Sequence, residues 1–177
     1  MWTKRDSKTA FDGKRFSVHV DSVTMSDGTD DEYAYITMKS PGVAVVAVSE
    51  SGVVLINEYK YPLNQFVWQV PKGTVEPGEG VHAAARRELS EETGIDAETF
   101  EDLGVVYSQP TQVVSQMHII LARSLMSTEP RREAQEYIKE VTTISCNDAL
   151  RWIMGGRIRD AVSIAALCMA LQVMRHG

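Results

Sequence analysis

The chain has 177 residues, 44% of them hydrophobic, which is enough for one domain with a substantial core. Its formal net charge of −6 argues against a general nucleic-acid surface, because phosphate backbones select basic faces. The N-terminus lacks an apolar run of signal-peptide length, and no apolar run elsewhere could span a bilayer. We therefore expect a cytoplasmic protein that binds neither nucleic acid nor membrane. In a reducing compartment, Cys146 and Cys168 should be small core residues rather than a disulfide.

The first 40 residues predict an N-terminal β-hairpin. Residues 15–25 alternate enough to form a strand, a Ser-Asp-Gly turn signal follows, and residues 32–38 can form the returning strand. We therefore divide the chain into a hairpin extension, residues 1–40, and a main domain, residues 41–177.

The main domain predicts a mixed α+β fold, in which a mixed β-sheet is sandwiched between helices. A helix is expected after residue 80, and Ser145 and Asp160 are candidate N-caps for two further helices that run to about residues 154 and 174. Runs rich in β-branched and other apolar residues predict the strands. These strands are residues 42–49, 53–59, 66–70, 103–108, 116–122 and 141–144.

The first of these helices carries three acidic residues on one face. Glu88, Glu91 and Glu92 stand three and four residues apart, so their carboxylates share a stripe about 100° wide. Small residues fall in the same stripe, which suggests that it faces a cleft rather than open water. Carboxylates crowded in a poorly solvated site raise their pKa values or recruit a metal, and oxygen ligands suit Mg²⁺ or Mn²⁺. The alternative is an ordinary solvated acidic face.

The surrounding spacing decides between these readings. The pattern is Gly, five residues, Glu, seven residues, Arg-Glu-Leu, one residue, Glu-Glu, one residue, Gly-Ile, and its chance occurrence per starting point is on the order of one in a billion. It matches the signature of the Nudix hydrolases without a departure, so the chain resembles that superfamily. The residues that carry the match are Gly73, Glu79, Arg87, Glu88, Leu89, Glu91, Glu92, Gly94 and Ile95.

The resemblance implies an enzyme that hydrolyses a nucleoside diphosphate linked to another group, with Mg²⁺, or alternatively Mn²⁺, as cofactor. It implies that the metal is bound by Glu88, Glu91, Glu92 and the carbonyl group of Lys72.

Further roles in the motif follow from the same resemblance. Arg87 can orient a carboxylate through its hydrogen-bonding fork, and Gly94 would end the helix as a C-cap. Residues expected to take part in catalysis are Arg87, Glu91 and Glu92, while Gly73, Glu79 and Gly94 would be structural.

Several features are similar to the ADP-ribose pyrophosphatase branch of the superfamily: the N-terminal hairpin, the Tyr-Lys-Tyr-Pro segment at residues 59–62, Pro110, and the closing Gly-Arg-Ile-Arg-Asp. They imply cleavage of ADP-ribose or another ADP-sugar to AMP and a sugar phosphate such as ribose 5-phosphate, by a homodimer whose hairpin helps to build the substrate pocket. Lys60 stands where that branch commonly has arginine. The expected substrate-binding residues are Lys60, Pro110, and Tyr33 and Tyr35, which could stack on a base, although aromatic residues in strands more often serve packing.

The resemblance also places a catalytic glutamate in the polar stretch before the last strand. The chain offers Glu129, Glu133, Glu136 and Glu140 there, and we choose Glu136 because an apolar pair follows it. Glu91 is the alternative base. Other substrates, dinucleoside polyphosphates or GDP-mannose, stay open, as does a non-catalytic nucleotide sensor, although the complete set of acids favours the enzyme.

Overall fold

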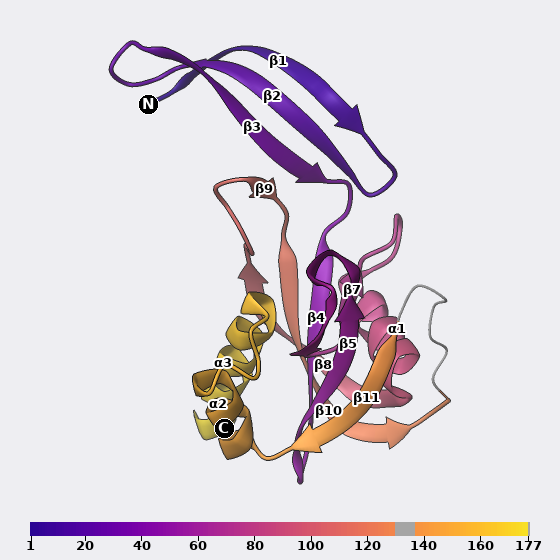
Figure 1. The fold of residues 1–177 in the computed structure, drawn as a ribbon. Coiled ribbons are helices and arrows are strands. Elements are labelled where there is room, and N and C mark those ends of the chain that lie inside the picture. Colours follow the sequence, from indigo (N-terminus) through magenta and orange to yellow (C-terminus); the bar gives the residue numbers. More distant parts are fainter. Residues whose placement is uncertain (130–136, 177) are drawn as a thin grey trace. The chain divides into compact units, whose positions relative to one another are not determined.

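The computed structural model describes residues 1–129 and 137–176, and within them a mixed sheet forms the centre of the main domain (Figure 1). Its strand order is β11-β5-β4-β10-β8, with β6 beside β5 and β7 beside β4. Strands β4 and β10 run parallel, whereas β5 is antiparallel to β4, β8 to β10 and β11 to β5. The bounds of the strands are β4 Gly42–Ser49, β5 Gly52–Lys60, β6 Gln65–Gln69, β7 Lys72–Thr74, β8 Ile95–Val106, β10 Met117–Ser127 and β11 Ile138–Ile144, and a 3₁₀ helix, η1, spans Tyr61–Leu63.

Helices cover both faces of this sheet (Figure 1). The helix α1 (Val81–Thr93) packs on one face, and α2 (Cys146–Met154) and α3 (Ala161–His176) pack on the other. Alternate residues of β4 divide between the two cores: Val45 faces the α1 side and Val46 faces the α3 side. Burial on both faces explains why β4 reads as a nearly continuous apolar run. The predicted sandwich of helices and mixed sheet is confirmed.

The helix ends follow local signals in the sequence. Gly94 ends α1 in the left-handed conformation, with φ 70°, where glycine has no Cβ to clash. The Ser145 hydroxyl accepts a hydrogen bond from the Asp148 backbone N–H at 3.1 Å and so caps α2. Asp160 accepts a hydrogen bond from the Ser163 backbone N–H at 2.8 Å at the start of α3. All three expected helix caps, one C-cap and two N-caps, are confirmed.

The N-terminal residues form a second, smaller sheet. The expected hairpin is present as β2 (Phe16–Thr24) and β3 (Asp30–Met38), which pair antiparallel. Another strand, β1 (Thr3–Asp12), pairs with β2, and the short β9 (Val113–Val114) runs parallel to β3. The sequence did not predict β1, because all of its residues are exposed and so neither face imposes an apolar period.

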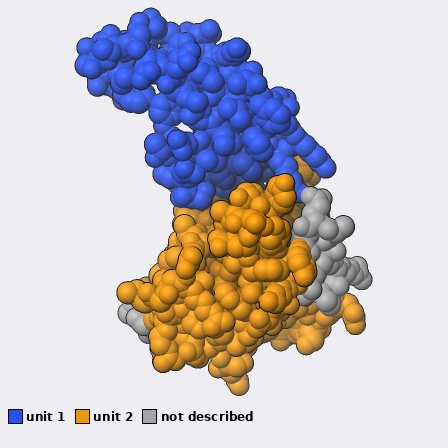
Figure 2. All heavy atoms as spheres, in the orientation of Figure 1, with its two compact units in different colours: residues 1–41, 107–116 blue, residues 42–106, 117–177 orange. Residues whose placement is uncertain are grey.

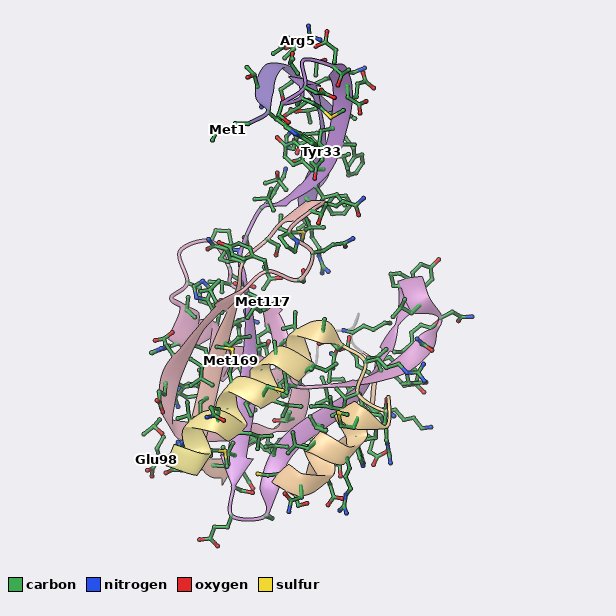
Figure 3. The ribbon with its side chains drawn as sticks, turned by 90° about the vertical axis from the view of Figure 1, so that its left-hand side faces the viewer. Met1, Arg5, Tyr33, Glu98, Met117 and Met169 are labelled. Carbon is green, nitrogen blue, oxygen red and sulfur yellow. The ribbon has the colours of Figure 1, made fainter. Side chains whose placement is uncertain are left out.

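The chain divides into two compact units, which are coloured separately in Figure 2. The small unit contains residues 1–41 and 107–116, and the large unit contains residues 42–106 and 117–177. Figure 3 labels Tyr33 in the small unit, where its hydroxyl donates to the Thr111 carbonyl oxygen and its ring meets that of Trp2 edge-on. Residues 107–116 therefore join the N-terminal strands in one unit, although the sequence boundary left them in the main domain.

Some elements differ in extent from their predictions. Strand β8 begins at Ile95 rather than at residue 103, and β11 begins at Ile138 rather than at residue 141. Both cysteines are free thiols, as expected, but Cys168 is exposed and is not a core residue. Among the described residues, no helix combines the length and apolar character needed to cross a bilayer.

Candidate active site

The loop around Gly73 and helix α1 meet without space for a side chain between them. A Cβ placed on Gly73 would lie 2.0 Å from Oε1 of Glu88, closer than any real non-bonded contact. Strand β7 holds this glycine in place because Gly73 pairs with Val43 of β4. The glycine therefore allows the backbone to pass directly against the carboxylate of Glu88, a residue that is only 5% exposed.

Arg87 connects the acidic residues of the signature. Its Nη1 donates to Glu88 Oε1 at 2.9 Å and to Glu91 Oε2 at 3.0 Å. Its Nε and Nη2 donate to the two carboxylate oxygens of Glu79 at 3.0 and 3.1 Å, and Nη2 also reaches the Thr74 carbonyl oxygen at 2.8 Å. The planar guanidinium suits this arrangement because its N–H groups point in fixed directions. Arg87 thus fixes Glu88 and Glu91 relative to the loop.

The charges in this network stabilise one another. The hydrogen bonds from Arg87 hold the pKa of Glu79 below its ordinary value, against the opposing effect of burial. Hydrogen bonding to Glu79 is also the largest effect that raises the pKa of Arg87, and Glu88 and Glu91 add to it. Arg87 and Glu79 therefore stay ionised at neutral pH.

Glu92 faces a different partner on the same loop. Its Oε2 accepts a hydrogen bond from the Lys72 backbone N–H at 3.0 Å, and the residue is 1% exposed. A charged carboxylate buried to this extent needs polar or cationic neighbours. The contact puts Glu92 beside the residue whose carbonyl group the sequence analysis named as a metal ligand.

The side chain of Lys72 connects this loop to α3. Its Nζ lies 2.6 Å from Asp160 Oδ1, and the two side chains are only 15% and 21% exposed. Burial lowers the pKa of Lys72 in spite of Asp160. Burial also opposes ionisation of Asp160, but Lys72 and Ser163 together keep its pKa below the ordinary value. Lys72 and Asp160 therefore each favour the charged form of the other, against the effect of burial.

Ser163 completes the connection between α3 and the loop. Its hydroxyl donates to Asp160 Oδ2 at 2.6 Å and accepts from the Val70 backbone N–H at 3.0 Å. Two backbone groups of the loop segment, at Val70 and Lys72, are therefore held by α3 and α1 respectively. The sequence predicted Asp160 as a helix cap and as the end of the Gly-Arg-Ile-Arg-Asp segment, and gave Ser163 no role, because neither contact with the loop has a local sequence signal.

The donors of the signature have the chemistry that a hard divalent cation prefers. Glu88, Glu91 and Glu92 offer oxygen ligands only, and the absent side chain at Gly73 brings backbone close to Glu88. Within residues 1–129 and 137–176, however, no three acidic, histidine or cysteine side chains converge as a preformed metal site. Arg87 holds one oxygen each of Glu88 and Glu91, while Glu92 turns to Lys72. The residue types therefore fit a divalent cation, and their roles as its ligands stay a prediction.

The structure places the other predicted site residues in different parts of the molecule. Lys60 belongs to the large unit, where its Nζ pairs with Glu58 Oε2 at 2.6 Å. Tyr33, Tyr35 and Pro110 belong to the small unit, so their proposed contact with substrate stays a prediction. Glu136 lies outside the described residues, as does the alternative Glu133.

Comparison with known proteins extends this description. A NUDIX domain model matches residues 38–165. The ADP-ribose pyrophosphatase of Bacillus subtilis is 31% identical over 160 residues, which cover 89% of this chain and 85% of that protein. The methanol dehydrogenase activator of Bacillus methanolicus is 29% identical over 161 residues, covering 89% and 85% of the two chains. An ADP-ribose pyrophosphatase of Mycobacterium tuberculosis is 26% identical over 174 residues, covering 97% and 83%.

A solved structure shares the fold. The crystal structure of an ADP compounds hydrolase superposes with a TM-score of 0.89 and 22% identity, covering 99% of this chain and 95% of that chain. The fold, the complete signature and the family match together define the class: the chain belongs to the NUDIX domain family. It is a Nudix hydrolase, and the relatives it resembles include two that are named ADP-ribose pyrophosphatase.

Proposed function

We propose that this protein hydrolyses the pyrophosphate bond of ADP-ribose, or of another ADP-sugar, and requires Mg²⁺ to do so. The observation that carries the proposal is the group of signature carboxylates on α1 beside the glycine loop. Glu88 packs against Gly73, Arg87 binds Glu88 and Glu91, and Glu92 accepts from the Lys72 backbone N–H. The names of two relatives support the choice of substrate, because the chain matches each of them over more than four fifths of its length.

The proposed reaction adds water across one phosphoanhydride bond. The water oxygen forms a bond to one phosphorus, the bond from that phosphorus to the bridging oxygen breaks, and a proton is released, so that ADP-ribose yields AMP and ribose 5-phosphate. Mg²⁺, or Mn²⁺ in its place, would lower the pKa of a bound water and offset the negative charge of the substrate. The carboxylates of Glu88, Glu91 and Glu92 and the Lys72 carbonyl group are the proposed ligands.

The protein groups have separate tasks in this proposal. Arg87 bridges the carboxylates of Glu88 and Glu91 through Nη1 and binds the loop at the Thr74 carbonyl oxygen, and its positive charge offsets the repulsion between the two carboxylates. Glu136 is the proposed base that takes the proton of water, with Glu91 as the alternative. Lys60 and Pro110, with Tyr33 and Tyr35, are proposed to contact the substrate.

A panel of substrates tests the proposal. Purified protein is incubated with ADP-ribose, GDP-mannose, NADH or diadenosine polyphosphates, with Mg²⁺, with Mn²⁺ or with a chelator, and the released products are identified. We expect AMP and ribose 5-phosphate from ADP-ribose, formed only with a divalent cation. Faster cleavage of GDP-mannose or a diadenosine polyphosphate would correct the substrate, and the absence of any cleavage would favour a nucleotide-sensing role.

We also propose that the protein works as a homodimer in the cytoplasm, without nucleic acid or membrane as partner. The support for a dimer is the exposed sheet of the small unit, in which every residue of β1 is open to solvent. Sedimentation at working concentration should give twice the chain mass. A monomer under the same conditions would contradict this part of the proposal.

A further inference from the structure

Ser163 is a polar residue on an apolar helix. Residues 161–174 of α3 contain no charged residue, and the neighbouring Val162, Ala166 and Leu167 belong to the core between α3 and the sheet. Ser163 itself is 0% exposed. Because a buried hydroxyl group is costly unless it is hydrogen-bonded, the partners of this hydroxyl group indicate its role.

The Ser163 hydroxyl group has two partners, and their chemistry determines the direction of both hydrogen bonds. The Val70 backbone N–H can only donate, at 3.0 Å, so the Ser163 oxygen accepts there. The hydroxyl hydrogen is donated to Asp160 Oδ2 at 2.6 Å. That oxygen also accepts from the Ser163 backbone N–H at 2.8 Å, so capping of α3 does not require the hydroxyl group. The separate contribution of the hydroxyl group is its contact with Val70, 93 positions away in the chain.

Val70 begins a segment of three residues whose backbone is bound by three different elements. The Val70 N–H donates to α3, as described above. Next along the chain, the Pro71 carbonyl oxygen accepts from the Val45 N–H of β4 at 2.8 Å. The Lys72 N–H then donates to Glu92 of α1 at 3.0 Å. Of these three contacts, only the first depends on a side chain outside the signature.

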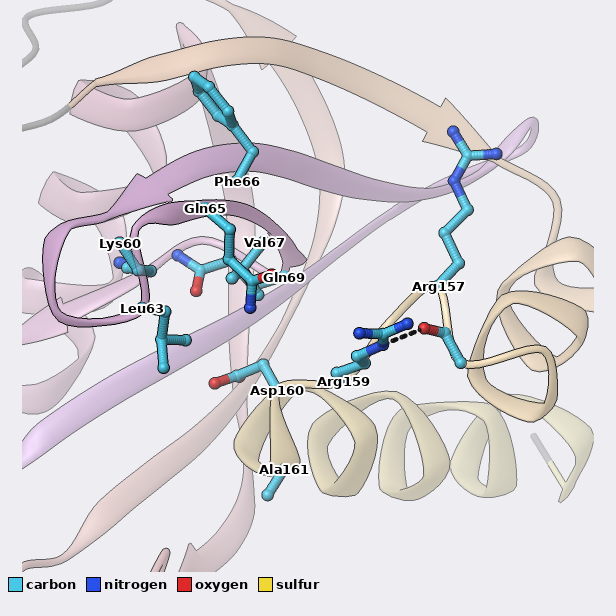
Figure 4. A pocket seen from close by; sticks show the side chains of 11 residues that line it. Lys60, Leu63, Gln65, Phe66, Val67, Gln69, Arg157, Arg159, Asp160 and Ala161 are labelled. Carbon is cyan, nitrogen blue, oxygen red and sulfur yellow. Dashed lines mark hydrogen bonds between the residues drawn. The ribbon is translucent and has the colours of Figure 1, made fainter.

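Loss of the hydroxyl group would act mainly on Val70. Val70 and Ser163 are both 0% exposed, so water does not reach the N–H group that would lose its acceptor. Figure 4 shows Asp160 at the start of α3, where it borders a cavity of about 530 Å³. Asp160 would also keep the Ser163 backbone N–H and Lys72 Nζ as donors. The backbone at residue 70, rather than Asp160, is therefore the group that the hydroxyl group controls.

We propose that Ser163 is a positioning residue for the divalent cation: by binding the Val70 N–H, it fixes the backbone that presents the Lys72 carbonyl group. The inference rests on the proposed function, in which that carbonyl group is a metal ligand. Ser163 itself contacts neither metal nor substrate and acts through the intervening backbone. Pro71 has a fixed φ and restricts the residue before it, so a displacement at Val70 is passed on to Lys72.

Binding of Mn²⁺ to the protein alone tests the inference without substrate or turnover. Electron paramagnetic resonance measures the free Mn²⁺ during a titration and so gives the dissociation constant. We expect Ser163→Ala to bind Mn²⁺ about tenfold more weakly than the wild type, as is usual when a group that orients a metal ligand is lost. Glu92→Gln should also lose affinity, which shows that the ion occupies the signature site. Wild-type affinity in Ser163→Ala, or no binding of Mn²⁺ by the wild type, would overturn the inference.

Ser145 provides the matched control, because its hydroxyl group makes the same two kinds of hydrogen bond without reaching the loop. It accepts from the Asp148 backbone N–H at 3.1 Å and donates to Asp148 Oδ2 at 2.5 Å. Ser145→Ala should lower the melting temperature, as loss of an N-cap does, and leave the affinity for Mn²⁺ unchanged. An equal loss of affinity in Ser145→Ala and Ser163→Ala would mean that Mn²⁺ binding follows overall stability, contrary to the inference.

Ser163→Cys separates hydrogen bonding from packing. A thiol fills the space of the hydroxyl group but is a weak donor and a weak acceptor. We therefore expect Ser163→Cys to lose affinity for Mn²⁺ as Ser163→Ala does. Normal affinity in Ser163→Cys would show that the residue only fills space, and the positioning role would be wrong.

Amide hydrogen exchange, followed by nuclear magnetic resonance, tests the route through the backbone. In Ser163→Ala, the amide hydrogens of both Val70 and Lys72 should exchange faster by about tenfold or more, because less free energy is needed to open the segment. The amide hydrogen of Ala149, which bonds to the Ser145 carbonyl oxygen in α2, should keep its exchange rate. Faster exchange at Val70 with unchanged exchange at Lys72 would contradict the route.

Kinetics with ADP-ribose connect the inference to the proposed reaction. In Ser163→Ala, the Mg²⁺ concentration for half-maximal rate should rise by about tenfold, while KM for ADP-ribose at saturating Mg²⁺ stays at the wild-type value. A raised KM with an unchanged requirement for Mg²⁺ would place Ser163 in support of substrate binding and overturn the inference. If the wild type cleaves none of the tested substrates, the proposed function fails, whereas the Mn²⁺ titration and the exchange rates still decide the role of Ser163.

Discussion

Gly73 and Glu88 fit together so closely that the carboxylate of Glu88 takes the space a side chain on residue 73 would need: a Cβ there would lie 2.0 Å from Oε1 and 2.1 Å from Cδ. This contact joins the loop and the helix of the signature. It explains on steric grounds why residue 73 is a glycine, independently of any need for backbone flexibility.

Replacing Gly73 by alanine should therefore displace Glu88 or the loop. We expect Gly73→Ala to lower the free energy of unfolding by about 1–3 kcal/mol, as overpacking does, and to lower kcat by about tenfold or more. Gly80→Ala is the control for kcat, because a Cβ on Gly80 meets nothing within 4 Å and its φ is −79°, while its cost in stability should stay below about 1 kcal/mol, that of a poorer N-cap for α1. Thermal unfolding and steady-state kinetics of both variants check this, and equal behaviour of the two would remove the steric argument.

Substitution of Glu92 tests the metal site without removing its packing. Glutamine has nearly the same shape and can still accept the hydrogen bond from the Lys72 backbone N–H. We expect Glu92→Gln to retain its melting temperature and to lose metal-dependent turnover by about 100-fold or more, because a charged oxygen ligand is lost. Glu98→Gln, at an exposed position on β8, should leave both properties unchanged. Near-normal turnover by Glu92→Gln would defeat the assignment of Glu92 to the metal site.

The role of the Arg87 fork can be separated from its charge. Lysine keeps the positive charge but cannot donate along the fixed directions that reach Glu79, Glu88 and Glu91 together. We expect Arg87→Lys to lower kcat by about 10–100-fold, since it loosens the residues that position the ligands. The neighbouring Arg86 pairs with Asp96 on a more exposed surface, so Arg86→Lys should change stability by less than about 1 kcal/mol and leave kcat unchanged. An unchanged kcat in Arg87→Lys would indicate that charge alone matters, and a similar loss of activity in both variants would contradict a specific role of the Arg87 fork.

Local signals in the sequence predicted a large part of the fold. Gly94, Ser145 and Asp160 act within one helical turn, so the helix ends could be placed from neighbouring residues. Strand β1 could not, because its fully exposed residues carry no apolar period. The early part of β8 was also missed, since its exposed acidic residues interrupt the apolar pattern expected of a strand.

The candidate site likewise has some contacts that local sequence predicts and others that depend on how distant elements pack. The spacing of the signature predicted that Arg87 and the glutamates of α1 would gather near Gly73, because one helix and one short loop determine their positions. The pairing of Lys72 with Asp160 joins residues far apart in the sequence, and it arises only when α3 packs on the sheet. Lys60 pairs with Glu58, an alternate residue of β5, and its expected contact with substrate stays a prediction.

The Lys72–Asp160 pair yields the last prediction, because breaking one side of a buried ion pair leaves the other charge without compensation. We expect Asp160→Asn and Lys72→Met each to lower the free energy of unfolding by about 3 kcal/mol, and the double variant to lose clearly less than the sum. Asp96→Asn, which breaks the more exposed pair with Arg86, should cost less than about 1 kcal/mol. Denaturant unfolding of the four variants and the wild type completes the cycle. Because asparagine can still cap α3, a loss that is fully additive would show that Lys72 and Asp160 act independently, and the connection from α3 through Lys72 to the loop beside Glu92 would then have no energetic support.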